Sequence, residues 1–552
     1  MTPRLIPART SHTPGHEVQL IVDSPAAHRV RVHHLDRLVA EVAVVDGIAR
    51  IPAPPVGGYG ATAVDAAGTA LARTAFDVLD DPFDRPRYGF VTKMDDAGPL
   101  ADMSLLYRRL HLSVAQFYDW AYRHSTLLPP ATDHPPVDDY LDPLGQPRSL
   151  RVIDELAAGF SDIGTVPLGY SAVYAIGSDE VSRWDPQVLR REDGAPYRLG
   201  EDFLVLVDPG DPEWLAHYTE QLRAVIDRTR LEGFHLDQYG WPKFARTSRG
   251  RVDVAASFVR MLGAVRDAVP EARFMFNNVN DFGTRETAAC AQDASYIEVW
   301  SPHDTLQDLA DLVARTRALR PDHPPIISAY LSCLKSSESG GVEAAHCTMA
   351  AVFSSGGTHL LLGDTSNGLT DPYYPRNATL TPQAIDALVP WYDFLVRYGD
   401  LLLPAEVTEV TEFYSGGINE DVLVDAGPHR VSTKAAPDSL WVRVFRTGDG
   451  SHIVHIVNLL GLDEIGWDHV KPAAVPLEGA TLRVATGLAP AGAASASPEL
   501  PDLVALTGHD AGSAAQSDAL SAGQEHVEFP LPPLGRWTLL WLPAADSQET
   551  LP

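Results

Sequence analysis

The stretch GFHLDQYG at residues 233–240 constrains the fold more than any other part of the chain. Asp211 and Pro212 before it are typical of a helix start, and apolar residues recur at helical spacing from there to Arg230. A helix followed directly by an apolar strand indicates an αβ step of a parallel sheet. This strand ends in a carboxylate, an amide and an aromatic ring. In a β/α barrel the chemistry lies at that end of the strands, so Asp237 is the first candidate for a catalytic residue.

Strand and helix patterns alternate over residues 85–400. Eight short segments are expected to be strands: residues 88–94, 115–120, 171–176, 234–239, 273–279, 296–300, 325–331 and 358–364. Helical periodicity lies between them, for example at residues 101–112, 252–268, 305–319 and 342–353. Eight such units predict an α/β chain built on a (β/α)8 TIM barrel. Residues 203–208 form either a ninth strand or a peripheral one, so the count of eight is an interpretation.

The two flanking regions have the pattern of β-sheet domains. Residues 1–84 contain short, partly alternating β-branched segments separated by turn residues, which predicts an N-terminal, Ig-like β-sandwich. Helical periodicity disappears after residue 400, and residues 401–552 are expected to form a C-terminal β-sandwich. Within it, residues 488–521 are rich in Ala, Gly, Ser and Pro, which predicts a long, partly mobile loop.

The charge balance narrows the classes of partner. The chain has 43 Lys and Arg against 73 Asp and Glu, a net charge of −30. Such a surface repels phosphate backbones and anionic lipids, so neither nucleic acid nor membrane is an expected partner; it suits a neutral substrate, although simple solubility explains it equally well. Three widely spaced cysteines make no disulfide framework. The first residues lack the apolar core of a secretory signal, so a cytoplasmic location is expected unless a signal has been removed.

Polar and aromatic side chains recur where the expected strands end. Four of them are carboxylates: Asp119, Asp237, Glu298 and Asp364. Sugars are recognised by aromatic faces that stack on the ring and by charged or amide groups that bond its hydroxyls. The remaining candidates for contact with a sugar are Tyr118, Trp120, His124, His235, Gln238, Asn277, Trp300 and His359.

Asp237 and Glu298 follow the fourth and sixth expected strands, so one rim would hold both carboxyl groups. Glycoside hydrolysis needs such a pair, because one carboxylate attacks the anomeric carbon while a carboxylic acid protonates the leaving oxygen. The acid must keep its proton near neutral pH, and Glu298 suits this role because it lies between Ile297, Val299 and Trp300. Either residue alone would more often be an ion-pair partner; together they favour catalysis.

Five motifs of the chain resemble those of glycoside hydrolase family 66, which contains dextranases and cycloisomaltooligosaccharide glucanotransferases. They are RYGF at 87–90, QFYDW at 116–120 with Arg123 and His124, GFHLDQ at 233–238, YIEVW at 296–300 and GTH at 357–359. The resemblance implies retaining cleavage of α-1,6-glucosidic bonds in dextran or isomalto-oligosaccharides through a glucosyl-enzyme intermediate. It implies that Asp237 is the nucleophile and Glu298 the acid/base, and that Tyr118 and Asp119 bind the sugar beside the scissile bond. The chain departs from the family at residues 359–364, HLLLGD, where a glutamate is expected before the glycine.

Three other functions remain open at this point. A glucanotransferase would pass the glucosyl group to a sugar hydroxyl instead of water, and a non-catalytic carbohydrate-binding protein would need no carboxylate pair. A metal-dependent hydrolase is the third, but Cys333, His346 and Cys347 match no structural zinc spacing, so neither metal nor cofactor is expected. A calcium ion among loop aspartates, and the oligomeric state, are left open by the sequence.

Overall fold

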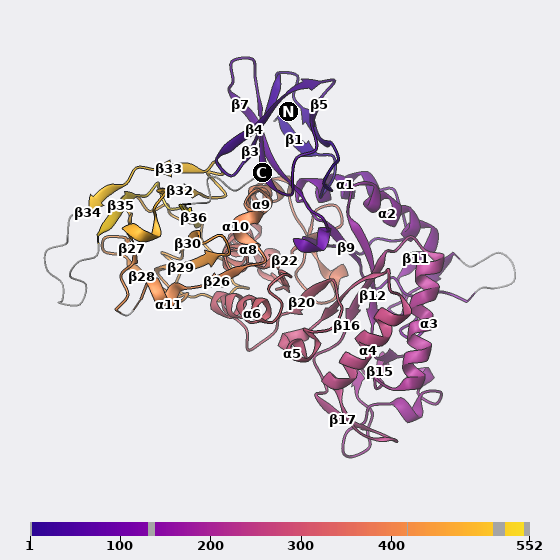
Figure 1. Cartoon of the computed structure of the whole chain (residues 1–552). Helices are drawn as coiled ribbons and strands as arrows, with labels where there is room; N and C mark the ends of the chain where they lie inside the picture. Colours follow the sequence, from indigo (N-terminus) through magenta and orange to yellow (C-terminus); the bar gives the residue numbers. More distant parts are fainter. Residues whose placement is uncertain (1–2, 131–137, 417, 512–524, 546–552) are drawn as a thin grey trace.

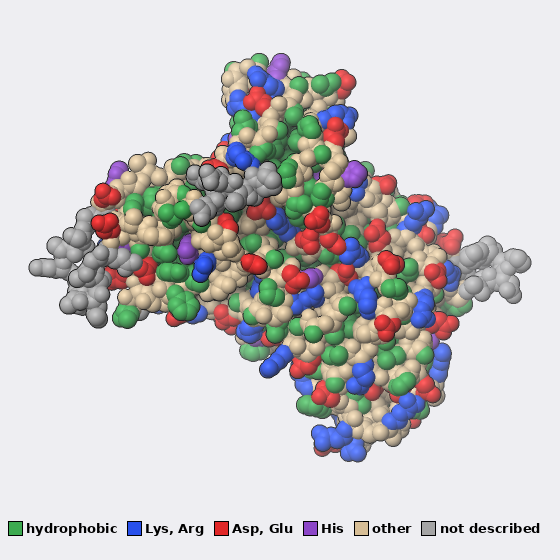
Figure 2. Space-filling view, viewed as in Figure 1, with side chains coloured by type: hydrophobic (Ala, Val, Ile, Leu, Met, Phe, Trp, Pro, Cys, Tyr) green, Lys and Arg blue, Asp and Glu red, His purple; other side chains and the backbone are tan. Residues whose placement is uncertain are grey.

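A computed structural model of the chain describes residues 3–130, 138–416, 418–511 and 525–545. Figure 1 shows three β-rich regions: an N-terminal sheet at the top, a large central sheet surrounded by helices, and C-terminal sheets at the left. No helix among the described residues combines the length and apolar character needed to cross a membrane. Acidic and basic side chains are interspersed over the face shown in Figure 2, so the negative charge does not gather in one patch on that face.

The N-terminal region is a seven-stranded antiparallel sheet in the order β1-β2-β5-β4-β3-β6-β7. Its inward-facing residues, among them Val18, Leu20, Val30 and Ile51, form a core of their own, as the alternating pattern of the sequence requires. The strands are β1 (Arg4–Pro7), β2 (Val18–Asp23), β3 (Arg29–His34), β4 (Arg37–Val45), β5 (Ile48–Ile51), β6 (Gly57–Val64) and β7 (Ala70–Val78).

The central sheet has eleven strands in the order β22-β21-β20-β19-β16-β12-β9-β8-β23-β24-β25, parallel from β22 to β23. The last two, β24 (Asn367–Gly368) and β25 (Ala378–Thr379), pair antiparallel. Residues from six of these strands meet in one cluster, while their sequence neighbours pack outward against helices: Met275 points inward, and Phe274 and Phe276 point outward. The sheet is therefore curled around its own inner core. Its parallel strands are β8 (Tyr88–Val91), β9 (Val114–Phe117), β12 (Val166–Ala172), β16 (Gly233–Asp237), β19 (Arg273–Asn277), β20 (Ala294–Glu298), β21 (Ile326–Ser328), β22 (Thr358–His359) and β23 (Leu362–Gly363).

Helices alternate with these strands and cover the outer face of the sheet (Figure 1). Helix α3 (Pro212–Arg228) begins as its sequence indicates, because the Asp211 side chain accepts hydrogen bonds from the N–H groups of Glu213 and Trp214. The other helices of this region are α1 (Leu100–Arg109), α2 (Leu150–Asp162), α4 (Val254–Ala268), α5 (Thr284–Thr287), α6 (Leu306–Leu319), α7 (Cys333–Ser336), α8 (Glu338–Phe353), α9 (Pro382–Arg397) and α10 (Gly399–Leu402).

The third and eighth strands differ from the expectation. The third is β12, which begins five residues before the predicted start at residue 171. Pro167 and Gly169 interrupt its sequence pattern, yet Gly169 is required there, since an added Cβ would lie 2.7 Å from the Trp120 ring nitrogen. The eighth is divided into β22, which pairs with β21, and β23, which pairs with β8. Residues 203–208 are peripheral, because β15 (Leu204–Leu206) pairs antiparallel with β13 (Ala175–Ile176) and β14 (Arg198–Leu199) in a separate small sheet.

The C-terminal region contains a seven-stranded and a four-stranded sheet that share one apolar core. The prediction of a long loop at residues 488–521 is wrong for its first part, because that part contributes three short strands. Residues 512–521 lie outside the described residues. The strands are β26 (Val407–Glu409), β27 (Val422–Asp425), β28 (Arg430–Ser432), β29 (Ser439–Thr447), β30 (His452–Asn458), β31 (Thr481–Ala485), β32 (Ala493–Ala496), β33 (Val504–Leu506), β34 (His509–Ala511), β35 (His526–Pro530) and β36 (Trp537–Leu542).

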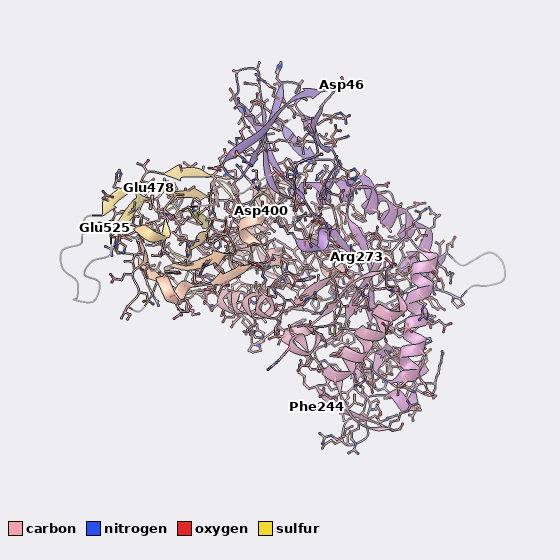
Figure 3. The ribbon with its side chains drawn as sticks, viewed as in Figure 1. Asp46, Phe244, Arg273, Asp400, Glu478 and Glu525 are labelled. Atoms are coloured by element: carbon pink, nitrogen blue, oxygen red, sulfur yellow. The ribbon has the colours of Figure 1, made fainter. Side chains whose placement is uncertain are left out.

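Charged contacts attach the N-terminal sheet to the central region. Asp400, labelled at this junction in Figure 3, accepts hydrogen bonds from Arg85 at 2.6 Å and from the Gly58 N–H at 2.9 Å, and its Oδ2 lies 3.1 Å from His34 Nε2. A second pair, Asp77 with Arg87 at 2.6 Å, is fully buried. Because Asp400 bonds β3 and β6, and Asp77 of β7 bonds Arg87 beside β8, both contacts fix the N-terminal sheet against the central region.

Candidate active site

A cavity of about 770 Å³ opens at the carboxyl ends of the central strands. This is the end at which parallel β/α structures position ligands. Side chains from loops after seven of the strands contribute to its wall. The lining residues are Gln116, Tyr118, Asp119, His124, Leu144, Tyr170, Leu199, Phe203, His235, Asp237, Gln238, Tyr239, Gly240, Trp241, Asn277, Val279, Asn280, Glu298, Trp300, Tyr330, Pro372, Tyr373, Tyr374 and Arg376.

Asp237 is the last residue of β16 and lies in the wall of this cavity. Only 8% of its surface is exposed. Its Oδ1 accepts a hydrogen bond of 2.7 Å from the Asn277 amide, and its Oδ2 accepts one of 2.7 Å from the Tyr170 hydroxyl. Both oxygens are therefore fixed in direction by neutral donors.

Glu298, the last residue of β20, is held in the same way two strands further along the sheet. Its Oε2 accepts a 2.9 Å hydrogen bond from the Asn277 amide and its Oε1 accepts one of 2.9 Å from the Trp300 indole. One nitrogen of Asn277 thus bonds both carboxylates. The Asp237 and Glu298 oxygens that it bonds are therefore separated by no more than the sum of 2.7 and 2.9 Å.

Burial changes the proton affinity of both groups. Loss of solvent raises the pKa of Asp237, and the nearby charge of Glu298 raises it further. Burial also raises the pKa of Glu298. Two carboxylates this close resist simultaneous ionisation, so the pair holds one proton to a higher pH than an isolated carboxyl group would.

Tyr118 and Asp119, which follow β9, form another part of the wall. The Tyr118 ring stacks on Tyr374 with centroids 4.2 Å apart. Asp119 has a φ of +47°, a conformation that non-glycine residues adopt rarely and mostly in functional or tight-turn positions. Burial raises the pKa of Asp119 to about 7, with a further contribution from Asp142. The site therefore contains a third carboxyl group whose pKa is raised by burial.

The other predicted residues in the wall have separate environments. His235 lies beside Tyr88, its Nδ1 2.9 Å from the Tyr88 hydroxyl, and burial lowers its pKa to about 3. Burial likewise lowers the pKa of His124 to about 4, so both rings are neutral. Gln238 donates to the Asn277 carbonyl at 3.1 Å. Trp300 remains 41% exposed at the rim.

Three predicted substrate-binding residues, Trp120, His359 and Asp364, lie outside the lining of the cavity in this structure. Trp120 is fully buried and donates to the Tyr170 carbonyl at 3.0 Å, while His359 Nε2 lies 3.1 Å from the Ala329 carbonyl. Asp364 accepts 2.8 and 2.6 Å hydrogen bonds from the N–H and hydroxyl of Thr92. Since Thr92 directly follows β8, this carboxylate joins the ends of the eighth and first strands instead of facing the cavity.

Several aromatic residues of the wall were not predicted from sequence, notably Tyr170, Tyr239, Trp241, Tyr330 and Tyr374. Tyr170 lies within β12 and bonds Asp237, and Tyr330 follows β21 and meets the Trp300 ring edge-on at 5.8 Å. Their position in the sequence could have indicated them, because both tyrosines lie at or near one end of an expected strand. Among the described residues, no group of three or more His, Cys, Asp or Glu side chains is placed to hold a metal ion.

Known proteins resemble the chain at low identity. A cycloisomaltooligosaccharide glucanotransferase of Niallia circulans is 23% identical over 293 residues, which is 49% of this chain and 30% of that protein. A dextranase of Streptococcus salivarius is 23% identical over 320 residues, 49% of this chain and 38% of that protein. The chain therefore spans about a third of the length of these relatives.

A solved structure matches nearly the whole chain. It is a cycloisomaltooligosaccharide glucanotransferase of Paenibacillus sp. in complex with cycloisomaltoheptaose, with a TM-score of 0.84, 18% identity, and coverage of 98% of this chain and 100% of that one. At this identity the likeness establishes the fold. The sequence model of glycosyl hydrolase family 66 matches residues 9–541. On that match across almost its full length, the chain belongs to glycosyl hydrolase family 66.

Proposed function

We propose that the protein is a retaining glycoside hydrolase that cleaves α-1,6-glucosidic bonds in isomalto-oligosaccharides or dextran. Asp237 is the nucleophile and Glu298 the general acid and base. The names of the similar proteins, a dextranase and glucanotransferases of cyclic isomalto-oligosaccharides, support this class of substrate. The wall supports it too, because its aromatic rings can stack on a sugar ring and its amide, hydroxyl and charged groups can bond sugar hydroxyls.

The Asp237–Asn277–Glu298 arrangement carries the proposal. Retaining enzymes hold their two carboxyl groups about 5–5.5 Å apart, whereas inverting enzymes leave roughly 6.5–9.5 Å for a water molecule. The two oxygens that Asn277 bonds lie at most the sum of 2.7 and 2.9 Å apart, which supports direct attack by a carboxylate. Because one amide bonds both groups, their separation is fixed before substrate binds.

In the first step, a carboxylate oxygen of Asp237 attacks the anomeric carbon while Glu298 gives its proton to the glycosidic oxygen. The bond from carbon to that oxygen breaks, the shortened glucan leaves as an alcohol, and the glucosyl group stays bound to Asp237 as an ester. Burial raises the pKa of Glu298, which favours its protonated form at the start of this step, and two carboxylates this close resist simultaneous ionisation.

In the second step, Glu298 takes a proton from water, which attacks the same carbon and releases Asp237. The ester has no charge, so the repulsion that kept Glu298 protonated is gone, and hydrogen bonds from Asn277 and Trp300 stabilise its carboxylate form. The same residue can thus serve as acid and then as base.

The proposed architecture is a (β/α)8 barrel at residues 85–400, with β-sandwich domains at 1–84 and 401–552. Pairing of the divided eighth strand with both β21 and β8 supports closure of the sheet, and the shared core of the two C-terminal sheets supports a sandwich. This closure would set the ends of β16 and β20 on one rim.

Product analysis on α-1,6, α-1,4 and α-1,3 glucans and their oligosaccharides tests the proposal. Shortened isomalto-oligosaccharides from the α-1,6 substrates alone are expected, and proton NMR of the first product should show the α anomer. A first product in the β configuration would exclude retention, and cleavage restricted to α-1,4 or α-1,3 bonds would exclude the proposed linkage.

Glucanotransfer is the second candidate, favoured by the names of the similar enzymes. It differs only in the second step, where a sugar hydroxyl replaces water. Mass spectrometry of the same digests distinguishes the two, since transfer gives linear products longer than the substrate or cyclic products lacking one water. Hydrolysis gives only shorter linear products.

A further inference from the structure

Trp300 makes two different contacts at the rim of the cavity. Its indole N–H donates to Glu298 Oε1 at 2.9 Å, while its ring meets Tyr330 edge-on and 41% of the residue remains exposed. Because two fifths of the residue is exposed, packing fixes this ring less firmly than it fixes a fully buried tryptophan. Its position next to the carboxyl group must be maintained by other contacts.

Asn280, in the loop after β19, supplies those contacts. Its Oδ1 accepts from the Trp300 backbone N–H at 3.2 Å, and its Nδ2 donates to the Ser301 carbonyl at 2.9 Å. One side chain therefore holds both ends of the segment that carries the indole. Asn280 has a φ of +53°, in the left-handed region that asparagine tolerates better than most residues.

We propose that Trp300 is a positioning residue for Glu298, and that Asn280 holds Trp300 in place. Neither residue needs to touch the reacting atoms for this role. The inference rests on the proposed function, because it assigns the Trp300 indole to the group that carries the catalytic proton.

The physical basis is that an indole N–H can donate but cannot accept a hydrogen bond. It stabilises the carboxylate form of Glu298 and has no favourable contact with a proton on the same lone pair. Asn277 already bonds the other oxygen, Oε2, and a hydrogen bond from Tyr330 also lowers the pKa of Glu298. The indole adds to these two contacts. Trp300 therefore keeps the proton affinity of Glu298 from rising too far for the second step, in which Glu298 must act as a base.

Other groups around Glu298 also bear on its titration. Asp237 ends β16, which is separated from β20 in the sheet by β19 alone, and ionisation of either carboxyl group opposes ionisation of the other. The remaining titratable neighbours that interact with Glu298 are phenols, which stay neutral because burial raises their pKa values: Tyr118, Tyr296, Tyr330 and Tyr374. Removal of the indole donor should therefore act on the carboxyl pair alone.

The decisive variant is Trp300→Phe, which keeps an aromatic ring but lacks the N–H. The pH profile of kcat/KM on an isomalto-oligosaccharide should have an alkaline limb that reports loss of the proton from the Asp237–Glu298 pair. In Trp300→Phe this limb should move to higher pH by about one unit, the scale of one hydrogen bond to a charged group. A limb that stays in place or moves to lower pH would overturn the inference.

Asn280→Gly tests the second half of the inference. Glycine keeps the positive φ available and removes both hydrogen bonds to the segment that carries Trp300. The limb should move in the same direction as in Trp300→Phe but by less, with kcat/KM lowered about three- to tenfold. An Asn280→Gly enzyme with the wild-type limb would show that Asn280 does not hold the indole.

Phe244→Leu is the matched control. Phe244 is 62% exposed on the hairpin of β17 (Phe244–Thr247) and β18 (Gly250–Asp253), labelled at the bottom of Figure 3, and does not line the cavity. The alkaline limb of the Phe244→Leu pH profile should match that of the wild type. A shift equal to that of Trp300→Phe would refute a specific role for Trp300. The proposed function fails separately, if wild-type enzyme does not cleave α-1,6 bonds or if Glu298→Gln retains the alkaline limb.

Discussion

Asp237 and Asp400 are two carboxylates with opposite surroundings. At Asp237 the hydrogen-bond partners are neutral, a tyrosine hydroxyl and an asparagine amide, and the nearest charge is another carboxylate. At Asp400 they include the Arg85 guanidinium, together with His34 and the Gly58 N–H. The first lies at the end of a central strand, and the second at the junction with the N-terminal sheet.

The difference appears in the direction of each pKa. Burial raises the pKa of Asp237, and the Glu298 charge adds to the rise. Burial would also raise the pKa of Asp400, but Arg85, His34 and the Gly58 N–H outweigh it and hold the pKa below its usual range. A buried carboxylate matched to a cation stabilises the fold, whereas one without a cation is kept at the expense of stability. The comparison therefore separates candidates for structure from candidates for chemistry.

The largest expected effect is on turnover in Asp237→Asn. An amide cannot replace the nucleophile, so kcat on isomalto-oligosaccharides should fall by about 10⁴ or more. The same variant removes a buried charge next to Glu298. Its melting temperature at pH 8 should therefore be at least that of the wild type, and higher by up to about 2 °C. Near-normal turnover, or a clearly lower melting temperature, would break the contrast with Asp400.

Glu298→Gln should show an effect that depends on the leaving group. Natural substrates need a proton on the departing oxygen, so their kcat/KM should fall by roughly 10²–10⁴. A glycosyl fluoride needs little such help and should lose much less in the first step. Azide should then restore part of the turnover by attacking the glucosyl-enzyme without a base. Equal losses on both substrates would contradict the assignment of Glu298 as the acid.

Asp400→Asn should change stability and leave chemistry almost untouched. It leaves the Arg85 guanidinium, 11% exposed, without its nearest carboxylate. Because a quarter of the Asp400 side chain is exposed, the expected loss is about 2 kcal/mol, less than for a fully buried pair. Urea unfolding followed by circular dichroism measures this change, and kcat should remain within about twofold of wild type. A large loss of kcat with unchanged stability would reverse the proposed roles of the two carboxylates.

The smallest effect, and the sharpest form of the comparison, is in how these stability differences depend on pH. A folded-state pKa below the unfolded value contributes stability above the unfolded pKa that is lost as pH falls, so the deficit of Asp400→Asn should shrink below about pH 4. A raised folded-state pKa costs stability as pH rises, so the advantage of Asp237→Asn should grow from about pH 4 to pH 8. Melting curves of both variants and wild type should show the Asp400→Asn difference changing below about pH 4 and the Asp237→Asn difference changing above it, with slopes of opposite sign.

Sequence periodicity predicted the strands of the central sheet, because they are short apolar segments with helices between them. It placed Asp237 and Glu298 at strand ends, where the structure also has them. It misplaced the third strand because Gly169, which resembles a turn residue, is needed where Trp120 packs against the backbone. A local pattern cannot show that close approach, since the two residues are distant in sequence.

The sequence could not show in which direction the side chains at the strand ends point. His359 and Asp364 also stand at strand ends, but the divided eighth strand turns their side chains toward neighbouring strands. The aromatic wall came from loops and from residues such as Tyr330, whose role depends on a ring 30 residues away at Trp300. Such contacts follow from tertiary packing, so the sequence indicated the type of site better than its full membership.

Two close carboxyl groups whose hydrogen-bond partners are neutral should attract small cations into the cavity. A protonated amine about the size of a sugar ring would place a positive charge beside Asp237 and Glu298. This charge would resemble the one that develops on the sugar during cleavage. Protonated sugar-like amines should therefore inhibit strongly, and more so as the carboxyl pair ionises. Even a common amine buffer such as Tris should compete with substrate, so turnover measured in phosphate will exceed turnover measured in Tris at the same pH.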